Sequence, residues 1–229
     1  IPILEVGSAS ADLSAIRITF TGAYQKPIIV AGIPTHNGDE ELVIRITRIG
    51  SSSFDLYADL PNRCGSGNHA SEDFGFMILN TGMTGPILAG SGTYGICAGG
   101  ELCTPTYGCS SCDHSTGFDW LTISFTDPVD NPVVQSQILS HTGGDWVKTR
   151  QRAISDSAFQ VKQEEDGLDI GHNTEVYGWI AVSSGAGSVG GSTFEAIVTA
   201  DAVTHNPYTV SYSASFSQQP AVFGAMQTF

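Results

Sequence analysis

The sequence has little charge, and most of it is negative. Only 14% of the 229 residues are charged, with 9 Lys plus Arg against 23 Asp plus Glu, so the formal net charge is −14. A surface with so few cations cannot neutralise a run of phosphates, which excludes nucleic acid as a partner. A hydrophobic content of 41% at this low charge density also excludes an intrinsically disordered chain.

Long apolar runs are missing as well. The longest run, 28–33, is far too short to span a bilayer, so we expect no membrane span. The sequence begins with Ile1 and Pro2 rather than Met and contains no basic region followed by an apolar one, and no Asn-x-Ser/Thr sequence offers a site for N-glycosylation. Because all the cysteines lie between 64 and 112, we expect an oxidising compartment and a processed, secreted, extracellular protein.

The common catalytic motifs are absent. The chain has no Gly-x-Ser-x-Gly elbow, no phosphate-binding glycine loop and no His-Glu-x-x-His sequence. Carboxylate pairs exist, but nothing in the sequence marks one as buried and tuned for proton transfer. We therefore expect a protein that is not an enzyme.

The chain does contain an internal repeat. One group of matches has an offset of 105 residues, and a second group has an offset of 103, because one intervening loop differs by two residues. The first group is Phe20/Phe125, Pro27/Pro132, His36/His141, Gly38/Gly143, Arg45/Arg150 and Phe54/Phe159. The second group is His69/His172, Glu72/Glu175, Gly75/Gly178 and Gly82/Gly185.

A third copy starts with Tyr212, Phe216 and Pro220, which match Phe20, Tyr24 and Pro27 after one insertion. The repeats predict a first module at 1–85, a second at 86–190 and a partial third at 191–229. Glycine-rich stretches such as 183–191 are expected to join them. We call these modules the first, second and third repeat.

Within each repeat the periodicity indicates strands. Residues 16–20, 42–46 and 54–57 alternate between apolar and polar, whereas 28–31 and 179–182 are typical of short buried strands. Turn residues separate these segments at short intervals. We therefore predict an all-β protein of tandem small antiparallel β-sandwich modules with about six strands each, plus an incomplete third module.

The repeat resembles the H-type lectin domain. The resemblance rests on Phe-x6-Pro followed by a β-branched strand, an Arg strand, a Phe strand and the segment 175–182 (Glu-Val-Tyr-Gly-Trp-Ile-Ala-Val). It implies a six-stranded antiparallel sandwich, often assembled as a trimer, that binds N-acetylgalactosamine-type sugars at a subunit interface.

The resemblance also implies residues for a sugar site. The family uses an acidic residue after the proline strand, an arginine, and aromatic or histidine side chains. Asp39 or Asp145 would be the acid and Arg45 or Arg150 the arginine, while the aromatic contributor has no definite counterpart in the sequence.

Histidines lie beside the turn after each proline strand. His36 precedes 37–39, and His141 precedes 143–145, with Trp146 next to that second turn. Loop-borne polar groups beside an aromatic ring suit sugar recognition, so we include all three residues as candidates. Ordinary turn chemistry is the alternative interpretation.

Two polar patterns raise the question of a metal. In His69/Glu72 and His172/Glu175 the side chains would point to opposite faces of an extended chain, and two ligands are too few for zinc, so a structural pair is favoured. The acidic run 164–166 lacks the spacing of a calcium loop, and a solvated loop is favoured over Ca²⁺. No cofactor is expected.

The five cysteines favour disulfides over zinc. Four of them lie in a glycine-rich insertion at 93–117, and Cys-x-x-Cys at 109–112 lacks a second close pair. We expect one disulfide to tie the loop of Cys64, which lies outside the insertion, to the insertion. The odd thiol would be free or would bridge to another chain. The cysteines are Cys64, Cys97, Cys103, Cys109 and Cys112.

These features lead us to expect a structural subunit or segment of an extracellular polymer, filament or surface appendage. The partial third repeat would leave an apolar face and a sheet edge uncovered, which a neighbouring copy of the chain would bury as a donated strand. The alternatives are a piece of a longer array, or a secreted lectin for GalNAc/galactose-type glycans. The donated-strand candidates are Tyr212, Phe216, Val222, Phe223 and Phe229.

Overall fold

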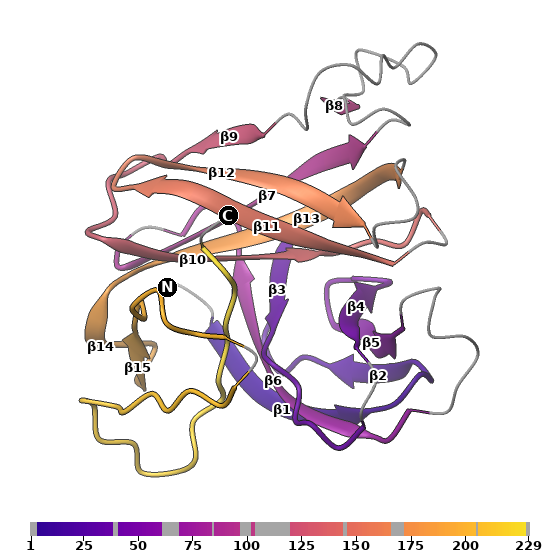
Figure 1. Cartoon of the computed structure of the whole chain (residues 1–229), viewed down its shortest axis with the longest axis horizontal. Helices are drawn as coiled ribbons and strands as arrows, with labels where there is room; N and C mark the ends of the chain where they lie inside the picture. The colour runs from indigo at the N-terminus through magenta and orange to yellow at the C-terminus, as the bar shows by residue number, and fades with distance from the viewer. Residues whose placement is uncertain are drawn as a thin grey trace.

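The computed structural model describes residues 4–38, 41–60, 69–83, 85–96, 102–103, 120–143, 146–165, 172–204 and 206–227. Within these ranges all regular secondary structure is β-strand, which confirms the all-β prediction (Figure 1). Consequently, no helix in the described part of the chain is long and apolar enough to cross a membrane.

The first repeat forms two three-stranded antiparallel sheets. The central strands, β6 and β5, each pair with two edge strands, giving the orders β1-β6-β3 and β2-β5-β4. The strands are β1 (Leu4–Ala11), β2 (Ile16–Thr19), β3 (Pro27–Ala31), β4 (Val43–Thr47), β5 (Ser53–Asp59) and β6 (Glu72–Asn80).

The second repeat has the same topology, with the orders β7-β13-β10 and β9-β12-β11. A short additional strand, β8 (Leu102–Cys103), pairs with the end of β7. The main strands are β7 (Ile87–Ile96), β9 (Leu121–Ser124), β10 (Pro132–Ile138), β11 (Val147–Ser155), β12 (Ala158–Glu165) and β13 (His172–Ser183).

Strand registers match between the two repeats residue by residue. Pro27 pairs with Asn80 as Pro132 pairs with Ser183. In the other sheet Arg45 lies opposite Tyr57, and the equivalent partners are Arg150 and Lys162. The offsets of 105 and 103 residues therefore hold in three dimensions.

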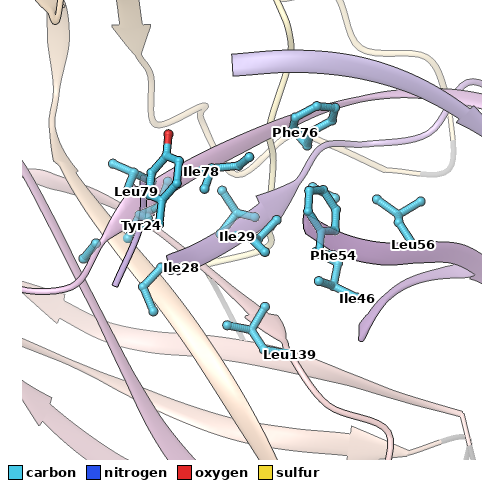
Figure 2. Packing of buried hydrophobic residues seen from close by; sticks show 14 of the residues in the cluster. Tyr24, Ile28, Ile29, Ile46, Phe54, Leu56, Phe76, Ile78, Leu79 and Leu139 are labelled. Atoms are coloured by element: carbon cyan, nitrogen blue, oxygen red, sulfur yellow. The ribbon is translucent and has the colours of Figure 1, made fainter. Parts of the chain in front are cut away.

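An aromatic stack fills the sandwich of each repeat. Between ring centroids, Phe54 lies 5.8 Å from Phe20 and 5.6 Å from Phe76. Figure 2 shows the rings of Phe54 and Phe76 close to each other. In the second repeat the equivalent rings are Phe125, Phe159 and Trp179, at 5.8 and 5.6 Å. Because Phe54 and Phe159 are both 0% exposed, each anchors the contact between its two sheets.

A glycine faces the third ring of each stack from the neighbouring edge strand. Gly7 lies opposite Phe76 and Gly90 opposite Trp179 in the strand registers. A Cβ atom at Gly90 would lie 2.5 Å from Cζ2 of Trp179, so only glycine allows the ring to lie flat on the strand.

The sheet β7-β13-β10 is buried on both faces. Trp179 and Ala181 of β13 belong to the core of the second repeat, whereas the alternate residues Ile180 and Val182 join the core of the first. Figure 1 shows β3 meeting β10 and β13, and Figure 2 shows Leu139 of the second repeat beside Ile28. The two repeats thus pack sheet face against sheet face.

The glycine-rich stretch 183–191, expected to join the second and third repeats, is ordered as part of a β-hairpin. The stretch contains β14 (Gly185–Val189), which pairs with β15 (Ser192–Ala196). Gly190 and Gly191 have φ angles of +57° and +86°, and they form the two-residue loop of this hairpin. Glycine is needed at these two positions because both have positive φ angles, and not because the segment must be flexible.

The third repeat reproduces two local contacts of the first. The carboxylate of Glu195 accepts hydrogen bonds from the backbone and hydroxyl of Ser213 and from Ala214 N, as the carboxylate of Glu5 accepts them from Thr21 and Gly22. The edge-to-face ring pairs also match, at 5.1 Å in the first repeat and 5.3 Å in the third. These rings are Phe20/Tyr24 and Tyr212/Phe216.

No strand is present in the described residues after β15, although the sequence predicts first strands there. The physical reason lies in the sheet orders, because β1, β2 and β3 are all edge strands that bond only to β5 or β6. The third repeat contains their equivalents but no equivalent of β5 or β6 within the 229 residues. Its segments therefore lack the central strands that would complete a ladder.

The third repeat packs on the first as the first packs on the second. Ile28, which follows the first proline, approaches Gly178 of the second repeat; Ala221, which follows Pro220, approaches Gly75 of the first. The second and third repeats meet where Val134 N donates to the side-chain oxygen of Gln227 at 3.0 Å. The contacts connect the three repeats in a ring.

We expect Gly90→Ala to destabilise the protein by about 1–3 kcal/mol, because the methyl group overlaps the Trp179 ring and forces the sheets apart. Gly50→Ala is the matched control, since its nearest neighbour would be Ser53 O at 3.7 Å. Urea unfolding followed by tryptophan fluorescence measures both. Equal midpoints for the two variants would contradict the role given to Gly90.

Candidate functional site

A buried carboxylate organises the loop after the proline strand of the first repeat. Glu72, at the start of β6, is 1% exposed. It accepts hydrogen bonds from the Thr35 hydroxyl at 2.5 Å, from Asn37 N at 2.8 Å and from Gly38 N at 2.9 Å. Three residues of a loop are thereby tied to the central strand around one side chain.

Glu175 repeats this arrangement in the second repeat and is also 1% exposed. It accepts hydrogen bonds from the Ser140 hydroxyl, from Thr142 N at 2.8 Å and from Gly143 N at 3.2 Å. These donors flank His141 on both sides. Glu175 therefore fixes the backbone that carries this histidine.

Both carboxylates are held in the ionised form. Burial raises the pKa of Glu72 and of Glu175, but the hydroxyl and backbone N–H donors together outweigh burial, so the pKa of each lies below its ordinary value of 4.5. At neutral pH each loop is thus held by charge-assisted hydrogen bonds.

The side chains of His69 and Glu72 approach each other rather than pointing to opposite faces, and His69 also contacts the backbone, as expected of a structural pair. Nδ1 of His69 lies 3.9 Å from Oε1 of Glu72 and 2.7 Å from Ala70 O. Residues 69–71 precede the strand, so the alternation of an extended chain does not apply to them. The His172 side chain lies outside what the structure describes. No three His, Cys, Asp or Glu residues among the described ones gather as metal ligands would.

Side chains of the first two repeats meet at their junction. The Tyr57 hydroxyl of β5 lies 2.6 Å from Nδ1 of His141, and the two rings are 6.1 Å apart. Burial raises the pKa of Tyr57. The positive charge of Arg45 lowers this pKa, and the negative charges of Asp59 and Glu175 raise it further. Tyr57 therefore keeps its proton at neutral pH, and its hydroxyl shares a hydrogen bond with Nδ1 of His141.

The repeated arginine is paired with a carboxylate on the next strand. Nε of Arg45, which is 0% exposed, donates to Asp59 at 2.8 Å. Nε of Arg150 donates to Glu164 in the same way. Arg45 also lies opposite Tyr57 in the strand register, next to the residue that contacts His141 of the other repeat.

Two further sugar-binding candidates, His36 and Trp146, make no described contact with Tyr57 or His141. His36 is exposed on the first repeat, and Trp146 is only 8% exposed, with Nζ of Lys148 5.0 Å from its ring centroid. The Trp146 ring is therefore no open platform for a sugar. Asp39 and Asp145 lie outside the described residues.

The acidic run is not a solvated loop along its whole length. Glu164 lies in β12 and is paired with Arg150 and, at 3.3 Å, with Lys148. The strand continues to this position because the two cations of β11 face it across the ladder. Asp166 lies outside the described residues.

The disulfide predictions fall almost entirely outside the described residues. Only the backbone of Cys103 is placed, in β8. Of the insertion predicted at 93–117, residues 93–96 belong to β7. The other cysteines, Cys64, Cys97, Cys109 and Cys112, are not described.

The donated-strand candidates make contacts within the chain. Phe223 packs against the core of the first repeat, and Phe216 packs against Tyr212. Tyr212 and Val222 remain 49% and 44% exposed. Phe229 lies outside the described residues.

An open groove of about 370 Å³ runs along another part of the same junction. Its described lining is aliphatic or polar, without an aromatic ring, so it offers no stacking surface for a sugar. The lining residues are Gln25, Lys26, Pro27, Ile28, Ile49, Gly50, Ser51, Ser91, Leu139 and Val176.

Sequence reasoning missed Tyr57 and the role of Glu175. Tyr57 could have been found from the pairing of the Arg strand with the Phe strand. A hairpin turn near 50–53 places residue 57 opposite Arg45. Tyr57 and the partly exposed Asp59 present a ring and a carboxylate on β5, and His141 presents an imidazole on the loop that Glu175 holds. These groups can donate and accept hydrogen bonds but show no nucleophile-and-base geometry.

A comparison of the chain with protein-family models, curated proteins and solved structures gave no match.

We expect Glu175→Gln to cost about 1–3 kcal/mol of stability at pH 7, because a neutral amide cannot satisfy the same three donors. The lowered pKa of Glu175 makes its contribution complete above about pH 4.5 and progressively lost as the pH falls below that value. The difference between wild type and variant should therefore shrink in acid. Urea midpoints from pH 3 to 7 measure it, with the exposed Asp201→Asn as control. A difference independent of pH would contradict the clamp.

Proposed function

We propose that the protein binds carbohydrate at the junction of its first two repeats, as a lectin for galactose- or GalNAc-type sugars. The observation that carries the proposal is the contact of Tyr57 with His141, which unites side chains of two repeats beside a paired arginine. The resemblance to the H-type lectin domain supports it, because that family places its sugar site at a subunit interface.

The chemistry of the junction supports sugar recognition. Sugars present hydroxyl groups that need both donors and acceptors, and the imidazole of His141 and the carboxylate of Asp59 supply them. The loop that carries His141 is fixed by Glu175, so little conformational entropy is lost on binding. Tyr57 adds a ring against which the apolar face of a pyranose can pack.

The test is to titrate GalNAc and galactose into the protein and into two variants, His141→Ala and Tyr57→Phe, by isothermal titration calorimetry. We expect binding to weaken about tenfold or more in His141→Ala, and less in Tyr57→Phe, which loses one hydroxyl and keeps its ring. His36→Ala is the matched control, because it removes the equivalent histidine outside the junction. Equal affinity in all four proteins, or no binding of either sugar to wild type, would overturn the proposal.

We propose a second function, assembly into an extracellular polymer through the third repeat. The support is that two apolar residues of the third repeat are more exposed than their equivalents in the first repeat. Val222 is 44% exposed, whereas its first-repeat equivalent Ile29 is 0% exposed beneath the β2-β5-β4 sheet. Tyr212 is 49% exposed, against 7% for Phe20. An apolar face that is covered in one repeat is open in another, and open apolar faces mark interaction surfaces.

Val222→Asp should abolish assembly, because a carboxylate on this face opposes burial against a neighbour. Negative-stain electron microscopy and sedimentation measure it, with deletion of 208–229 as the stronger version. Val6→Asp, at a 42% exposed valine of β1, is the control. Filaments that persist in Val222→Asp and in the deletion would rule this assembly out.

A further inference from the structure

The three methionines of the chain differ in their exposure to solvent. Met83 is 6% exposed, and Met77 of β6 is partly buried against the core of the first repeat. Met226, in the third repeat, is 58% exposed. Because an oxidant in solution reaches an exposed thioether first, Met226 is the methionine most open to oxidation.

The exposure of Met226 does not follow from the incomplete third repeat alone. Met226 follows Pro220 by six residues, and the equivalent residues of the other repeats are Ile33 and Ile138. Ile33 is 59% exposed although its repeat is complete, whereas Ile138 is 2% exposed. This position can thus be open in a complete repeat, and the third repeat is the copy that places a sulfur there.

A guanidinium lies beside this sulfur. Nη1 of Arg150, on β11 of the second repeat, donates to Sδ of Met226 at 3.6 Å. A thioether is a weak hydrogen-bond acceptor, so the contact stabilises little by itself. The position of the guanidinium is set by its other contact, because Nε of Arg150 donates to Glu164. The sulfur therefore faces a donor that is already in place.

Two further contacts hold residues 226 and 227 on the second repeat. Val134 N of β10 donates to Oε1 of Gln227 at 3.0 Å. The amide of Gln151, which is 1% exposed, donates to Met226 O at 3.2 Å in the orientation that satisfies both of its ends. Neither contact uses the sulfur, so both are kept when the sulfur is oxidised. We call these two contacts and the one from Arg150 the 226–227 latch.

We propose that Met226 is a site of oxidation by hydrogen peroxide, and that the sulfoxide formed there fastens the third repeat more tightly to the second. In this reaction a lone pair of the sulfur attacks one peroxide oxygen, an S–O bond forms and the O–O bond breaks. The hydroxide that leaves takes the proton from the new S–OH group and becomes water. The sulfur is oxidised by two electrons, and the peroxide is reduced.

The surroundings of Met226 determine the direction of the effect. In a protein core a sulfoxide is disruptive, because it turns an apolar side chain into a polar one. At the exposed Met226 no new polar group has to be buried. The sulfoxide oxygen is a stronger acceptor than a thioether, and a hydrogen bond to it from Arg150 would be charge-assisted. Oxidation therefore strengthens the 226–227 latch.

The first measurement follows the oxidation of each methionine by peptide mass spectrometry in dilute hydrogen peroxide. We expect Met226 to gain an oxygen at least about tenfold faster than Met83, because Met83 is buried. In concentrated urea the two rates should become nearly equal, which shows that the fold sets the difference. Oxidation of Met83 as fast as Met226 in the folded protein would overturn the site.

The second measurement is hydrogen exchange of the Val134 amide, whose described partner is Gln227. Oxidised protein should exchange this amide about threefold or more slowly, since a stronger latch opens less often. Met226→Gln, which places an amide oxygen beside Arg150, should slow the exchange without peroxide. Met226→Leu is the matched control, because it keeps the apolar volume and has no sulfur, so peroxide should leave its Val134 exchange unchanged.

Unchanged or faster exchange in the oxidised protein would overturn the proposed strengthening. An equal slowing in peroxide-treated Met226→Leu would also overturn it, because another residue would then be responsible. Thermal unfolding shows that both variants are folded, and the measurements on the wild-type protein decide the proposal without them. The proposal depends neither on the sugar site nor on assembly through the third repeat.

Discussion

A carboxylate buried at the start of the central strand of each repeat is the interaction on which the surface features depend. Glu72 and Glu175 each bind three donors from the loop after the proline strand, so that this loop follows the central strand rigidly. The cost of burying a charge is offset only because all these donors converge on it. In the second repeat the result is a fixed position for His141.

The fixed position of His141 brings it to Tyr57 only because the first two repeats pack face to face. The sheet β7-β13-β10 buries its second face against the first repeat, which brings the loop of one repeat over the Arg strand of the other. Gln137 donates to Ile44 O across the same junction at 2.8 Å. A duplication whose copies pack in a ring thus creates side-chain contacts that neither copy has alone, and divergence between copies, as at Asp55 and Gln160, gives their surfaces different charges.

Much of the fold follows from the sequence, because alternation and turn residues act locally. The strands expected at 28–31 and 54–57 are found as Pro27–Ala31 and Ser53–Asp59. The contact of Tyr57 with His141 was not foreseeable in this way, since the two residues are 84 positions apart and meet only through sheet packing. Burial of Trp146 and the strand position of Glu164 were missed for a related reason. Both residues contact cations of β11, and a local reading of the sequence does not show these contacts.

The most direct test of the central claim is an NMR titration of the histidine ring signals with GalNAc. The account predicts that the His141 signals shift saturably while those of His36, in the equivalent loop of the first repeat, stay constant. Because Glu175 only positions the loop, Glu175→Gln should weaken this response without moving it to another histidine. Equal shifts at both histidines, or none at His141 at saturating sugar, would contradict the assignment of the junction as the binding site.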